Sequence, residues 1–390
     1  MVHPFGFHAV KTIRFEPGVC TRFADHVGAM LGGRILVVTD PGLMKLGLPD
    51  AAIESLRQHG ADVEVFSDVE ADPSRSTVEK ATARAADMGA TGIVGFGGGS
   101  SLDVAKLAAL LAGSGEQLDD AWGVGNAKGP RLPLAAVPTT AGTGSEVTPV
   151  AIVTLPDDEK RGVSSPILIP DAAILDPDLT LGLPGPITAA TGIDAMVHAI
   201  EAFASKSPNN NPISQASAVE ALSLLGQNIQ TAVTEPDNRE ARGAMLLGAM
   251  LAGQAFANAP VAAVHALAYP IGGRFHVPHG LSNALVLPHV LRFNAAGSED
   301  ARTVYAALAQ HTFPDLPATD GTQATCAAFI DRLEKLSQEL GLETKLRQVG
   351  ITQADLPGLA GDAMKQTRLL VNNPREVTEA DALHIYEQAF

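Results

Sequence analysis

A carboxylate and several histidines are the side chains of this sequence best suited to chemistry. Asp194 and His198 are four residues apart in a stretch with helical spacing, so both are expected on one helix face, one turn apart. Farther along the chain, one segment contains His265, His276 and His279. Asp194 with His198, His265 and His279 would supply one oxygen and three nitrogens to a divalent transition metal. Spacing alone does not establish which histidines converge, and a single histidine more often has a structural role.

A run of three glycines predicts an anion-binding turn. Residues 95–106 have the sequence GFGGGSSLDVAK, which follows an apolar run and opens a helical pattern. Glycines let backbone N–H groups approach an anion without a side-chain clash, and the N-terminus of the following helix adds partial positive charge. A diphosphate is the natural ligand, although the spacing matches neither the usual dinucleotide fingerprint nor the P-loop. The alternative is an ordinary flexible turn between a strand and a helix.

A second loop strengthens the prediction of a dinucleotide site. Residues 138–146, PTTAGTGSE, follow another apolar run and carry four hydroxyl side chains that could contact phosphate or ribose. Two such loops at strand ends of one sheet are typical of ligand binding at the carboxyl edge of parallel strands. Asp40 ends the first apolar run, where it could bind a ribose diol and repel a 2′-phosphate. We therefore expect NAD rather than NADP, with a strand-end turn as the alternative role of Asp40.

The elements that must position these residues divide the chain into two parts. In the first half, short apolar runs alternate with helical patterns, which predicts a Rossmann-like parallel α/β sheet; the runs lie at 35–40, 62–66, 91–96, 134–137 and 172–176. After Pro184 the β-branched runs stop, and helical spacing takes over in 187–206, 213–234, 239–258 and 324–340. We therefore expect an α/β domain over residues 1–185 and an all-helical domain over residues 186–390.

Composition excludes several classes of function. The 390 residues carry a formal net charge of −16, which argues against a nucleic-acid partner because such binding neutralises phosphates with Lys and Arg. No apolar run is long enough for a membrane span, and the first residues do not match a secretory signal. The two cysteines, Cys20 and Cys326, cannot build a disulfide framework or a cysteine metal site. A cytoplasmic protein is expected, without a membrane or nucleic-acid partner.

Over essentially its whole length the sequence resembles the iron-containing (group III) alcohol dehydrogenases. The segments that carry the resemblance are GGGSSLDVAK at 97–106, PTTAGTGSEVT at 138–148, LDP at 175–177, ATGIDAMVHAIEAF at 190–203, HVPHGLSNALVLPHVLRFN at 276–294 and NPR at 373–375. Together these motifs are far more specific than any one of them. The relatives in this family include lactaldehyde reductase, 1,3-propanediol dehydrogenase and butanol dehydrogenase.

The resemblance implies a dehydroquinate synthase-like architecture, with a dinucleotide-binding α/β domain, a helical catalytic domain and the active site in the cleft between them. It places the metal ligands on Asp194, His198, His265 and His279. The metal would be Fe²⁺, or Zn²⁺, which binds such ligands more tightly. The cofactor contacts that we predict are Asp40, Gly97, Gly98, Ser100, Asp103, Thr139, Thr140, Thr143 and Lys160. For the lysine the correspondence is loose, and Arg161 is the alternative. A homodimer or larger homo-oligomer is also implied.

The sequence departs from the family pattern around the reaction centre. Tyr269 stands where many relatives have a histidine near the nicotinamide that is assigned to proton transfer. Tyr269 could occupy the same space, or His276 could serve instead, so both are candidate catalytic residues. The substrate-pocket positions Val150 and Leu369 are more apolar than in lactaldehyde reductase, and Phe256 matches an aromatic wall. These residues favour a less polar alcohol or aldehyde.

The predicted function is an NAD(H)-linked oxidoreductase that interconverts an alcohol and its aldehyde or ketone, with the metal polarising the substrate oxygen. The alternatives on the same scaffold are a maleylacetate reductase, which uses no metal, and a 2-hydroxyacid:2-oxoacid transhydrogenase, which retains its cofactor. The intact metal-ligand pattern argues against the first. A sugar-phosphate cyclase would need basic side chains in the cleft, which the sequence does not indicate. A non-catalytic nucleotide sensor would bind NAD without turnover.

Overall fold

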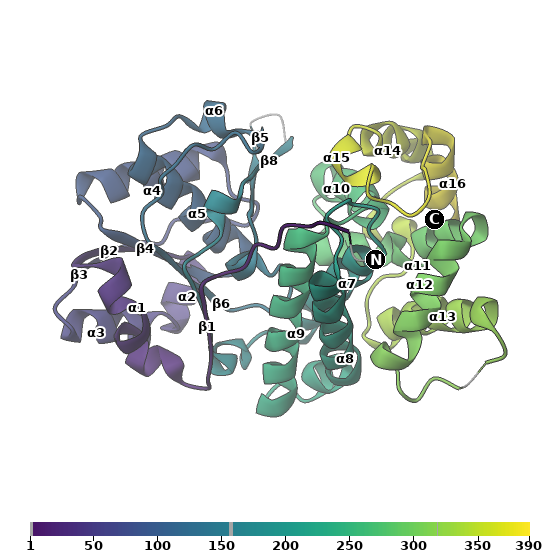
Figure 1. Ribbon diagram of the computed structural model, residues 1–390, viewed down its shortest axis with the longest axis horizontal. Helices are drawn as coiled ribbons and strands as arrows, with labels where there is room; N and C mark the ends of the chain where they lie inside the picture. Colours follow the sequence, from purple (N-terminus) through teal and green to yellow (C-terminus); the bar gives the residue numbers. More distant parts are fainter. Residues whose placement is uncertain (1–2, 156–158, 318) are drawn as a thin grey trace. The chain divides into compact units, whose positions relative to one another are not determined.

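The computed structural model describes residues 3–155, 159–317 and 319–390. The chain divides into two compact units, one formed by His8–Gly182 and the other by Met1–Phe7 together with Leu183–Phe390. Figure 1 shows the sheet-containing unit in purple and blue, and residues from Leu183 onward in teal, green and yellow. The assignment of cofactor binding to residues 1–185 and of metal binding to residues 186–390 remains a prediction.

The unit His8–Gly182 is built on a six-stranded parallel sheet with the order β1-β9-β6-β4-β2-β3. The strands are β1 (Thr12–Phe15), β2 (Arg34–Val38), β3 (Asp62–Phe66), β4 (Gly92–Gly97), β6 (Leu134–Pro138) and β9 (Ala172–Leu175). Five of them coincide with the apolar runs expected to be strands, which confirms the α/β fold class. The central strands are buried along almost their whole length because helices cover both faces of the sheet.

Alternate residues of each strand contribute to two separate cores. On β2, Leu36 and Val38 pack with α4 (Arg75–Asp87) and α5 (Gly99–Ser114), whereas Ile35 and Val37 belong to the core formed with α1 (Phe23–Leu31) and α3 (Asp50–Gln58). The twofold repeat of a strand sends successive side chains to opposite faces. The ends of the strands are therefore fixed between two layers of helices. This also fixes where the loops that follow the strands begin.

The order of the strands creates a point where ligands bind in such folds. β2 and β4 are neighbours in the sheet. After β2 the chain continues to β3 on one side, and after β4 it continues to β6 on the other, so the connections diverge between β2 and β4. In open α/β sheets, ligands bind outside the carboxyl ends of the strands at the point where the connections diverge. Asp40 follows β2, the glycine run follows β4, and the Thr139–Thr143 loop follows β6. The three predicted cofactor segments therefore share one edge of the sheet.

Four strands were not expected from the sequence. β1 pairs with β9 at the edge of the large sheet, and all four of its residues are exposed. A second sheet joins β5 (Gly123–Val124), β8 (Lys160–Ser164) and β7 (Val150–Thr154), with β7 and β8 antiparallel. These strands form because neighbouring strands in the folded chain pair with them. Apart from β7, they contain too few apolar residues to be recognised as strands in the sequence.

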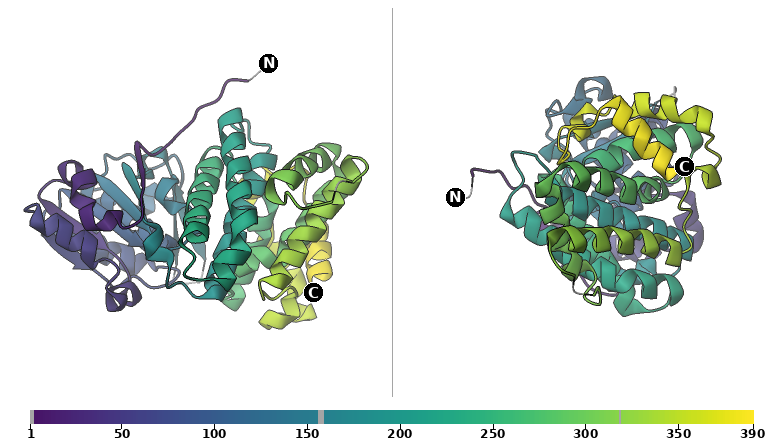
Figure 2. Two further views of the ribbon diagram at one scale, coloured as in Figure 1. Left: turned by 90° about the horizontal axis from the view of Figure 1, so that it is seen from below. Right: turned by 90° about the vertical axis from the view of Figure 1, so that its right-hand side faces the viewer.

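The unit that contains Leu183–Phe390 is helical, as expected. Its helices are α7 (Gly185–Ala204), α8 (Pro212–Thr234), α9 (Arg239–Asn258), α10 (Ala263–Phe275), α11 (His279–Gly297), α12 (Glu299–Thr312), α13 (Thr322–Glu339), α14 (Leu356–Ala363), α15 (Thr367–Leu370) and α16 (Glu379–Ala389). Helices α7, α8 and α9 pack against one another, and Figure 2 shows α8 and α9 running side by side. α11 packs against both α7 and α10.

A glycine permits the close contact between α7 and α11. A Cβ placed on Gly280 would lie 2.2 Å from the carbonyl oxygen of Ala190 and 3.3 Å from the Cβ of Asp194. Any side chain larger than hydrogen would therefore push the start of α11 away from α7. The contact sets the distance between His279, the first residue of α11, and Asp194 on α7.

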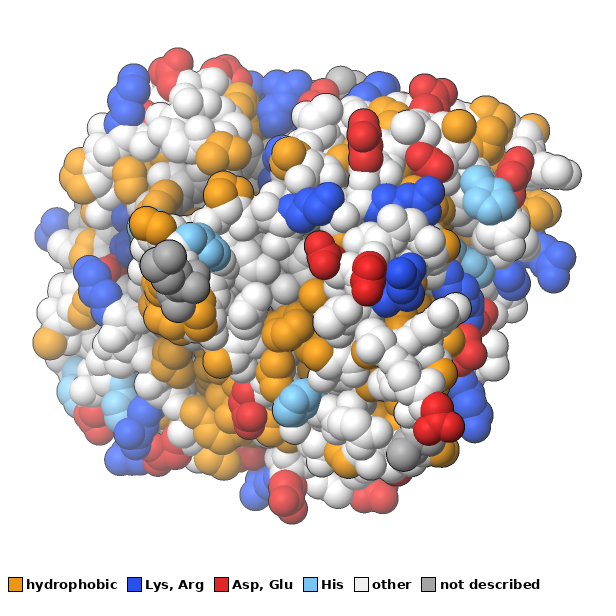
Figure 3. Space-filling view, turned by 45° about the vertical axis from the view of Figure 1, so that its right-hand side comes forward, with side chains coloured by type: hydrophobic (Ala, Val, Ile, Leu, Met, Phe, Trp, Pro, Cys, Tyr) orange, Lys and Arg blue, Asp and Glu red, His pale blue; other side chains and the backbone are white. Residues whose placement is uncertain are grey.

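Two surface features bear on possible partners. Among the described residues, no single helix is long and apolar enough to cross a membrane, although the bent pair α9 and α10 passes the same test by length and composition. On the face drawn in Figure 3, basic and acidic side chains are interspersed.

Candidate metal centre

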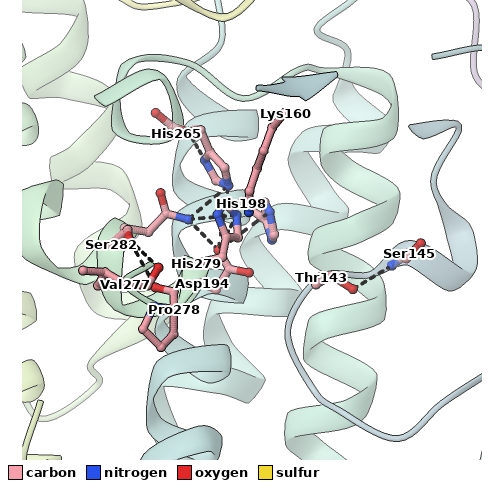
Figure 4. Close-up of polar contacts among 12 residues, drawn as sticks. Thr143, Ser145, Lys160, Asp194, His198, His265, Val277, Pro278, His279 and Ser282 are labelled. Carbon is pink, nitrogen blue, oxygen red and sulfur yellow. Dashed lines mark hydrogen bonds and ion pairs between the residues drawn. The ribbon is translucent and has the colours of Figure 1, made fainter. Parts of the chain in front are cut away.

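One carboxylate and three imidazoles meet inside the helical unit. Asp194 and His198 come from α7, His265 from the first turn of α10, and His279 from the start of α11. One ligand atom of each side chain lies within 4.8 Å of the corresponding atoms of the other three. Figure 4 shows the four groups pointing toward one another. These are the four side chains that were predicted to share a metal ion.

The distances suit a small divalent cation. Oδ1 of Asp194 lies 3.5 Å from Nε2 of His279, 3.8 Å from Nε2 of His265 and 4.0 Å from Nε2 of His198. Tetrahedral bonds of about 2.1 Å would put neighbouring ligand atoms about 3.4 Å apart. A small inward movement of the ligands would therefore close the set around a cation, and the nitrogen and oxygen donors match the chemistry of Fe²⁺ or Zn²⁺.

The site is largely buried, which strengthens the electrostatic interactions between its side chains, but one side of it remains accessible to solvent. Asp194 and His265 are each 2% exposed, whereas the side chain of His279 is 33% exposed. Burial alone would raise the pKa of Asp194, but the three histidines and the Asn283 amide outweigh it and hold this pKa below its usual value. Asp194 is therefore a carboxylate at neutral pH, available to a cation from the side of His279.

Aromatic contacts fix the orientation of the imidazoles. The ring of His198 stacks on Phe256 at 4.5 Å between centroids and on His265 at 4.6 Å. The ring of Tyr269 lies 6.5 Å from that of His265 and 5.8 Å from that of His279. Tyr269 is one helical turn after His265, which explains why it lies beside two of the proposed ligands.

His276 occupies a different environment from Tyr269. It is the exposed residue that ends α10, with a left-handed backbone (φ 55°), and its backbone N–H donates to the carbonyl of Gly272. Of the two candidates for proton transfer, Tyr269 is therefore the one that the structure places against the imidazole rings. A catalytic role for either residue remains a prediction.

Two further residues contact the four side chains, and neither was predicted from the sequence to have a role. The Nδ2 of Asn283 donates to Oδ1 of Asp194 at 2.6 Å and lies 3.3 Å from Nε2 of both His265 and His279. Glu201 contacts the other nitrogen of His265 at 2.7 Å. Their spacing carried a signal, because Glu201 is seven residues after Asp194 and Asn283 is four after His279, which puts each on the face of its neighbour.

The glycine run forms the predicted turn at the end of β4. Gly97 has φ 148°, and a Cβ there would lie 2.7 Å from Oγ of Ser101. Gly98 precedes α5, whose first turn receives no side-chain cap in the part of the chain described. The first backbone N–H groups of a helix lack partners within the helix, so this end suits an anion. Ser100 lies within that first turn.

The threonine loop lies directly against the glycine turn. The N–H of Thr139 donates to the carbonyl of Gly97 at 3.0 Å, and Cβ atoms on Gly98 and Gly99 would lie 3.6 Å from Thr140 and 2.9 Å from Thr143. The two loops, separated by about forty residues of sequence, are therefore one surface at the carboxyl end of β4 and β6. Figure 4 shows the Thr143 hydroxyl accepting from the N–H of Ser145, 3.3 Å away.

Asp40 and Lys160 lie at other positions in the same unit. Asp40 caps α2 (Pro41–Leu46) by accepting from the N–H of Leu43 at 3.0 Å, which uses one carboxylate oxygen. Lys160, on β8, forms an ion pair with Asp72 at 2.6 Å, and the alternative residue Arg161 pairs with Glu159. The turn role considered for Asp40 is thus present, and it is compatible with a ribose contact by the second oxygen.

Asp103 connects the two loops through a buried network. Its oxygens accept from Oγ of Ser145 at 2.6 Å and from the N–H of Ile152 at 2.9 Å. Lys106, one turn later and fully buried, donates to Ser145, to Thr148 and to the carbonyl of Val150. Both carboxylate oxygens of Asp103 are therefore engaged by the protein, and its direct contact with a cofactor remains a prediction.

The three predicted substrate-pocket residues have different surroundings. Phe256 stacks on His198, as described above. Leu369 is 3% exposed on α15, which packs against α10. Val150 begins β7 in the other unit and is partly exposed. Only Phe256 therefore contacts one of the four proposed ligands through a ring interaction that the structure records.

Comparison with known proteins identifies the family. A model described as iron-containing alcohol dehydrogenase matches residues 11–177, and one for the C-terminal part of the Fe-containing alcohol dehydrogenase family matches residues 188–390. Long-chain-alcohol dehydrogenase 1 of Geobacillus thermodenitrificans is 40% identical over 392 residues, covering 98% of this chain and 97% of that protein.

Solved structures agree with this assignment. A crystal structure of a 1,3-propanediol oxidoreductase matches with a TM-score of 0.94 at 33% identity, with 100% of both chains covered. The sulfoacetaldehyde reductase of Bifidobacterium kashiwanohense, solved in complex with NAD⁺, matches with a TM-score of 0.87 at 30% identity over 99% of each chain. The chain therefore belongs to the iron-containing alcohol dehydrogenase family. The resemblance, the fold and the assignment to an oxidoreductase family are confirmed.

The buried carboxyl group of Glu146, in the threonine loop, predicts that the stability of the protein depends on pH. Burial raises the pKa of Glu146 from its usual 4.5 to about 7. Folding therefore favours the protonated carboxyl, whose stabilising contribution is complete below pH 4.5 and is lost as the pH rises through about 7. Between about pH 5 and about pH 7.5, the natural protein should lose about 1–3 kcal/mol of stability relative to Glu146→Gln. Urea unfolding at the two pH values measures this difference.

The control for this prediction is Glu54→Gln, an exposed position on α3 of the same unit. Its stability should follow that of the natural protein at both pH values. Equal pH dependence in the natural protein and in Glu146→Gln would contradict the assignment of a raised pKa to the buried carboxyl.

Proposed function

We propose that the protein is an NAD(H)-linked, metal-dependent oxidoreductase that interconverts an alcohol and its aldehyde or ketone. The observation that carries the proposal is the buried group formed by Asp194, His198, His265 and His279, whose donor atoms lie within 4.8 Å of one another. This group also counts against the metal-free maleylacetate reductase reaction. Membership in the iron-containing alcohol dehydrogenase family supports the same reaction class.

The four side chains would hold a divalent cation. When bound, the cation would polarise the substrate oxygen and lower the pKa of an alcohol. Since N/O ligands generally bind zinc more tightly than ferrous iron, this ligand set does not by itself select iron. We propose Fe²⁺ as the cation, with Zn²⁺ as the competitor, and both must be tested in reconstitution.

The sheet edge would hold NAD, which accepts the hydride from the carbinol carbon. Gly97, Gly98 and Ser100 would contact the diphosphate at the start of α5, and Thr139, Thr140 and Thr143 would add hydroxyl contacts from the neighbouring loop. Asp40 would bind the adenosine ribose, with Lys160 as a further ribose contact. A related sulfoacetaldehyde reductase was solved with NAD⁺, which supports this cofactor.

Tyr269 would exchange the substrate proton, because its ring contacts those of His265 and His279. Phe256, Val150 and Leu369 would favour a substrate with an apolar substituent. The long-chain-alcohol dehydrogenase relative is consistent with such a substrate. We also propose a homo-oligomer and a cytoplasmic location, which the family resemblance and the composition support.

The direct test is a panel of C2–C8 alcohols and aldehydes with NAD(H), using protein reconstituted with Fe²⁺ or Zn²⁺. Oxidation of added NADH by a simple aldehyde is expected, and a transhydrogenase that retains its cofactor would not show it. His265→Ala should lose bound metal and nearly all turnover because one of four ligands is removed, while NAD binding stays intact. His384→Ala, an exposed position on α16, is the matched control. Normal turnover in His265→Ala would contradict the proposed centre.

Cofactor preference tests Asp40. In Asp40→Ser the hydroxyl can still cap α2, but the negative charge that repels a 2′-phosphate is lost. The ratio of kcat/KM for NAD to that for NADP should fall about 10-fold or more, which corresponds to about 1.4 kcal/mol. An unchanged ratio would mean that Asp40 does not meet the ribose.

The pH profile tests Tyr269. Tyr269→Phe removes the phenolic hydroxyl and retains the ring that contacts His265 and His279. Turnover should fall about 100-fold, with altered pH dependence and unchanged metal content, because general acid–base groups contribute about 10²–10⁴-fold. Unchanged rates across the pH range would place proton transfer on another residue.

A further inference from the structure

Glu201 is a buried carboxylate that binds two donors of a neighbouring helix. It lies on α7, one turn after His198, and is 4% exposed. One oxygen, Oε1, accepts from the backbone N–H of Val264 at 2.6 Å, and the other, Oε2, lies 2.7 Å from Nδ1 of His265. Both partners belong to the first turn of α10, whose N-cap residue Ala262 supplies no side-chain cap.

This pair of contacts determines where His265 carries its proton. When Glu201 is ionised, its oxygens only accept hydrogen bonds, and Nδ1 of His265 is then the donor of this contact. In the neutral imidazole, Nε2 then keeps its lone pair. That Nε2 is the atom 3.8 Å from Oδ1 of Asp194 and 3.3 Å from the amide nitrogen of Asn283. The lone pair of Nε2 therefore faces the interior of the ligand group, where the Asn283 amide is its neighbour.

We infer that Glu201 is a positioning residue that selects the metal-binding tautomer of His265. The inference rests on the proposed function, since it assigns a cation to Asp194, His198, His265 and His279. Metal-binding histidines commonly donate their second N–H to a carboxylate, which fixes the ring and increases its basicity. Glu201 also adds a second buried negative charge to that of Asp194, so the centre with three neutral imidazoles balances a divalent cation.

The geometry separates this role from simple capping of α10. In Glu201→Gln the side chain keeps its length but has one acceptor oxygen and one donor NH₂. The N–H of Val264 can only donate, so it requires the amide oxygen, which leaves the NH₂ facing Nδ1 of His265. The imidazole must then accept at Nδ1 and carry its proton on Nε2, where it points at the cation position. The glutamine would still cap the helix but would block the ligand.

The test compares Zn²⁺ affinity by isothermal titration calorimetry in the natural protein, Glu201→Gln, His265→Ala and the control Glu220→Gln, an exposed position on α8. Glu201→Gln should bind Zn²⁺ at least ~10- to 100-fold more weakly. Its NAD affinity and thermal unfolding midpoint without metal should match those of Glu220→Gln. A capping role alone would leave Zn²⁺ affinity unchanged.

The outcomes distinguish the two proposals. If Glu201→Gln binds Zn²⁺ normally while His265→Ala does not, the role of Glu201 is wrong and the metal centre stands. If His265→Ala binds Zn²⁺ normally, the metal centre itself is wrong.

A measurement on the natural protein keeps the inference testable if Glu201→Gln fails to fold. The ¹⁵N shifts of the His265 imidazole in metal-free protein should show a protonated Nδ1 and an unprotonated Nε2. The opposite pattern would overturn the inference.

Discussion

The helical unit is organised around a buried group of side chains whose oxygen and nitrogen lone pairs face one another. Asp194, His198 and His265 are each 4% exposed or less. Burying a carboxylate and unprotonated imidazole nitrogens together costs free energy unless a cation or a hydrogen bond satisfies them. The helices meet this cost with a set of specific contacts. Asn283 donates to Asp194, Glu201 engages the far nitrogen of His265, and Gly280 allows α11 to approach α7.

In the sheet unit, the loops at the strand ends must also be held in place. A dinucleotide site needs exposed backbone N–H groups held in fixed positions, and loops alone hold them poorly. Here the N–H of Thr139 donates to Gly97, and Lys106 and Asp103 on α5 bind the segment that follows the threonine loop. The buried polar network therefore fixes the threonine loop, and the glycines let that loop pack directly against the start of α5.

Much of this could be predicted from the sequence. Periodicity located the five apolar strands and the long helices, because burial on both faces requires apolar residues at regular spacing. The interval between Asp194 and His198 predicted their common face. Edge strands such as β1 were missed because their stability comes from pairing with β9 rather than from their own composition.

Spacing along the chain could not predict which distant residues lie together in the folded protein. The sequence alone did not choose among His265, His276 and His279, and the family resemblance made that choice. The left-handed turn at His276 explains the outcome, since it ends α10 and lets α11 begin at His279. Glu201 and Asn283 were passed over because a carboxylate or an amide seven or four residues from a ligand has meaning only once the partner helix is placed.

X-ray absorption at the zinc edge of the reconstituted protein measures whether Asp194, His198, His265 and His279 bind one cation together. One zinc per chain is expected, bound by three imidazole nitrogens and by carboxylate oxygen at about 2.0–2.2 Å. Zinc that binds with no imidazole in its coordination shell, or far below one ion per chain, would contradict this expectation.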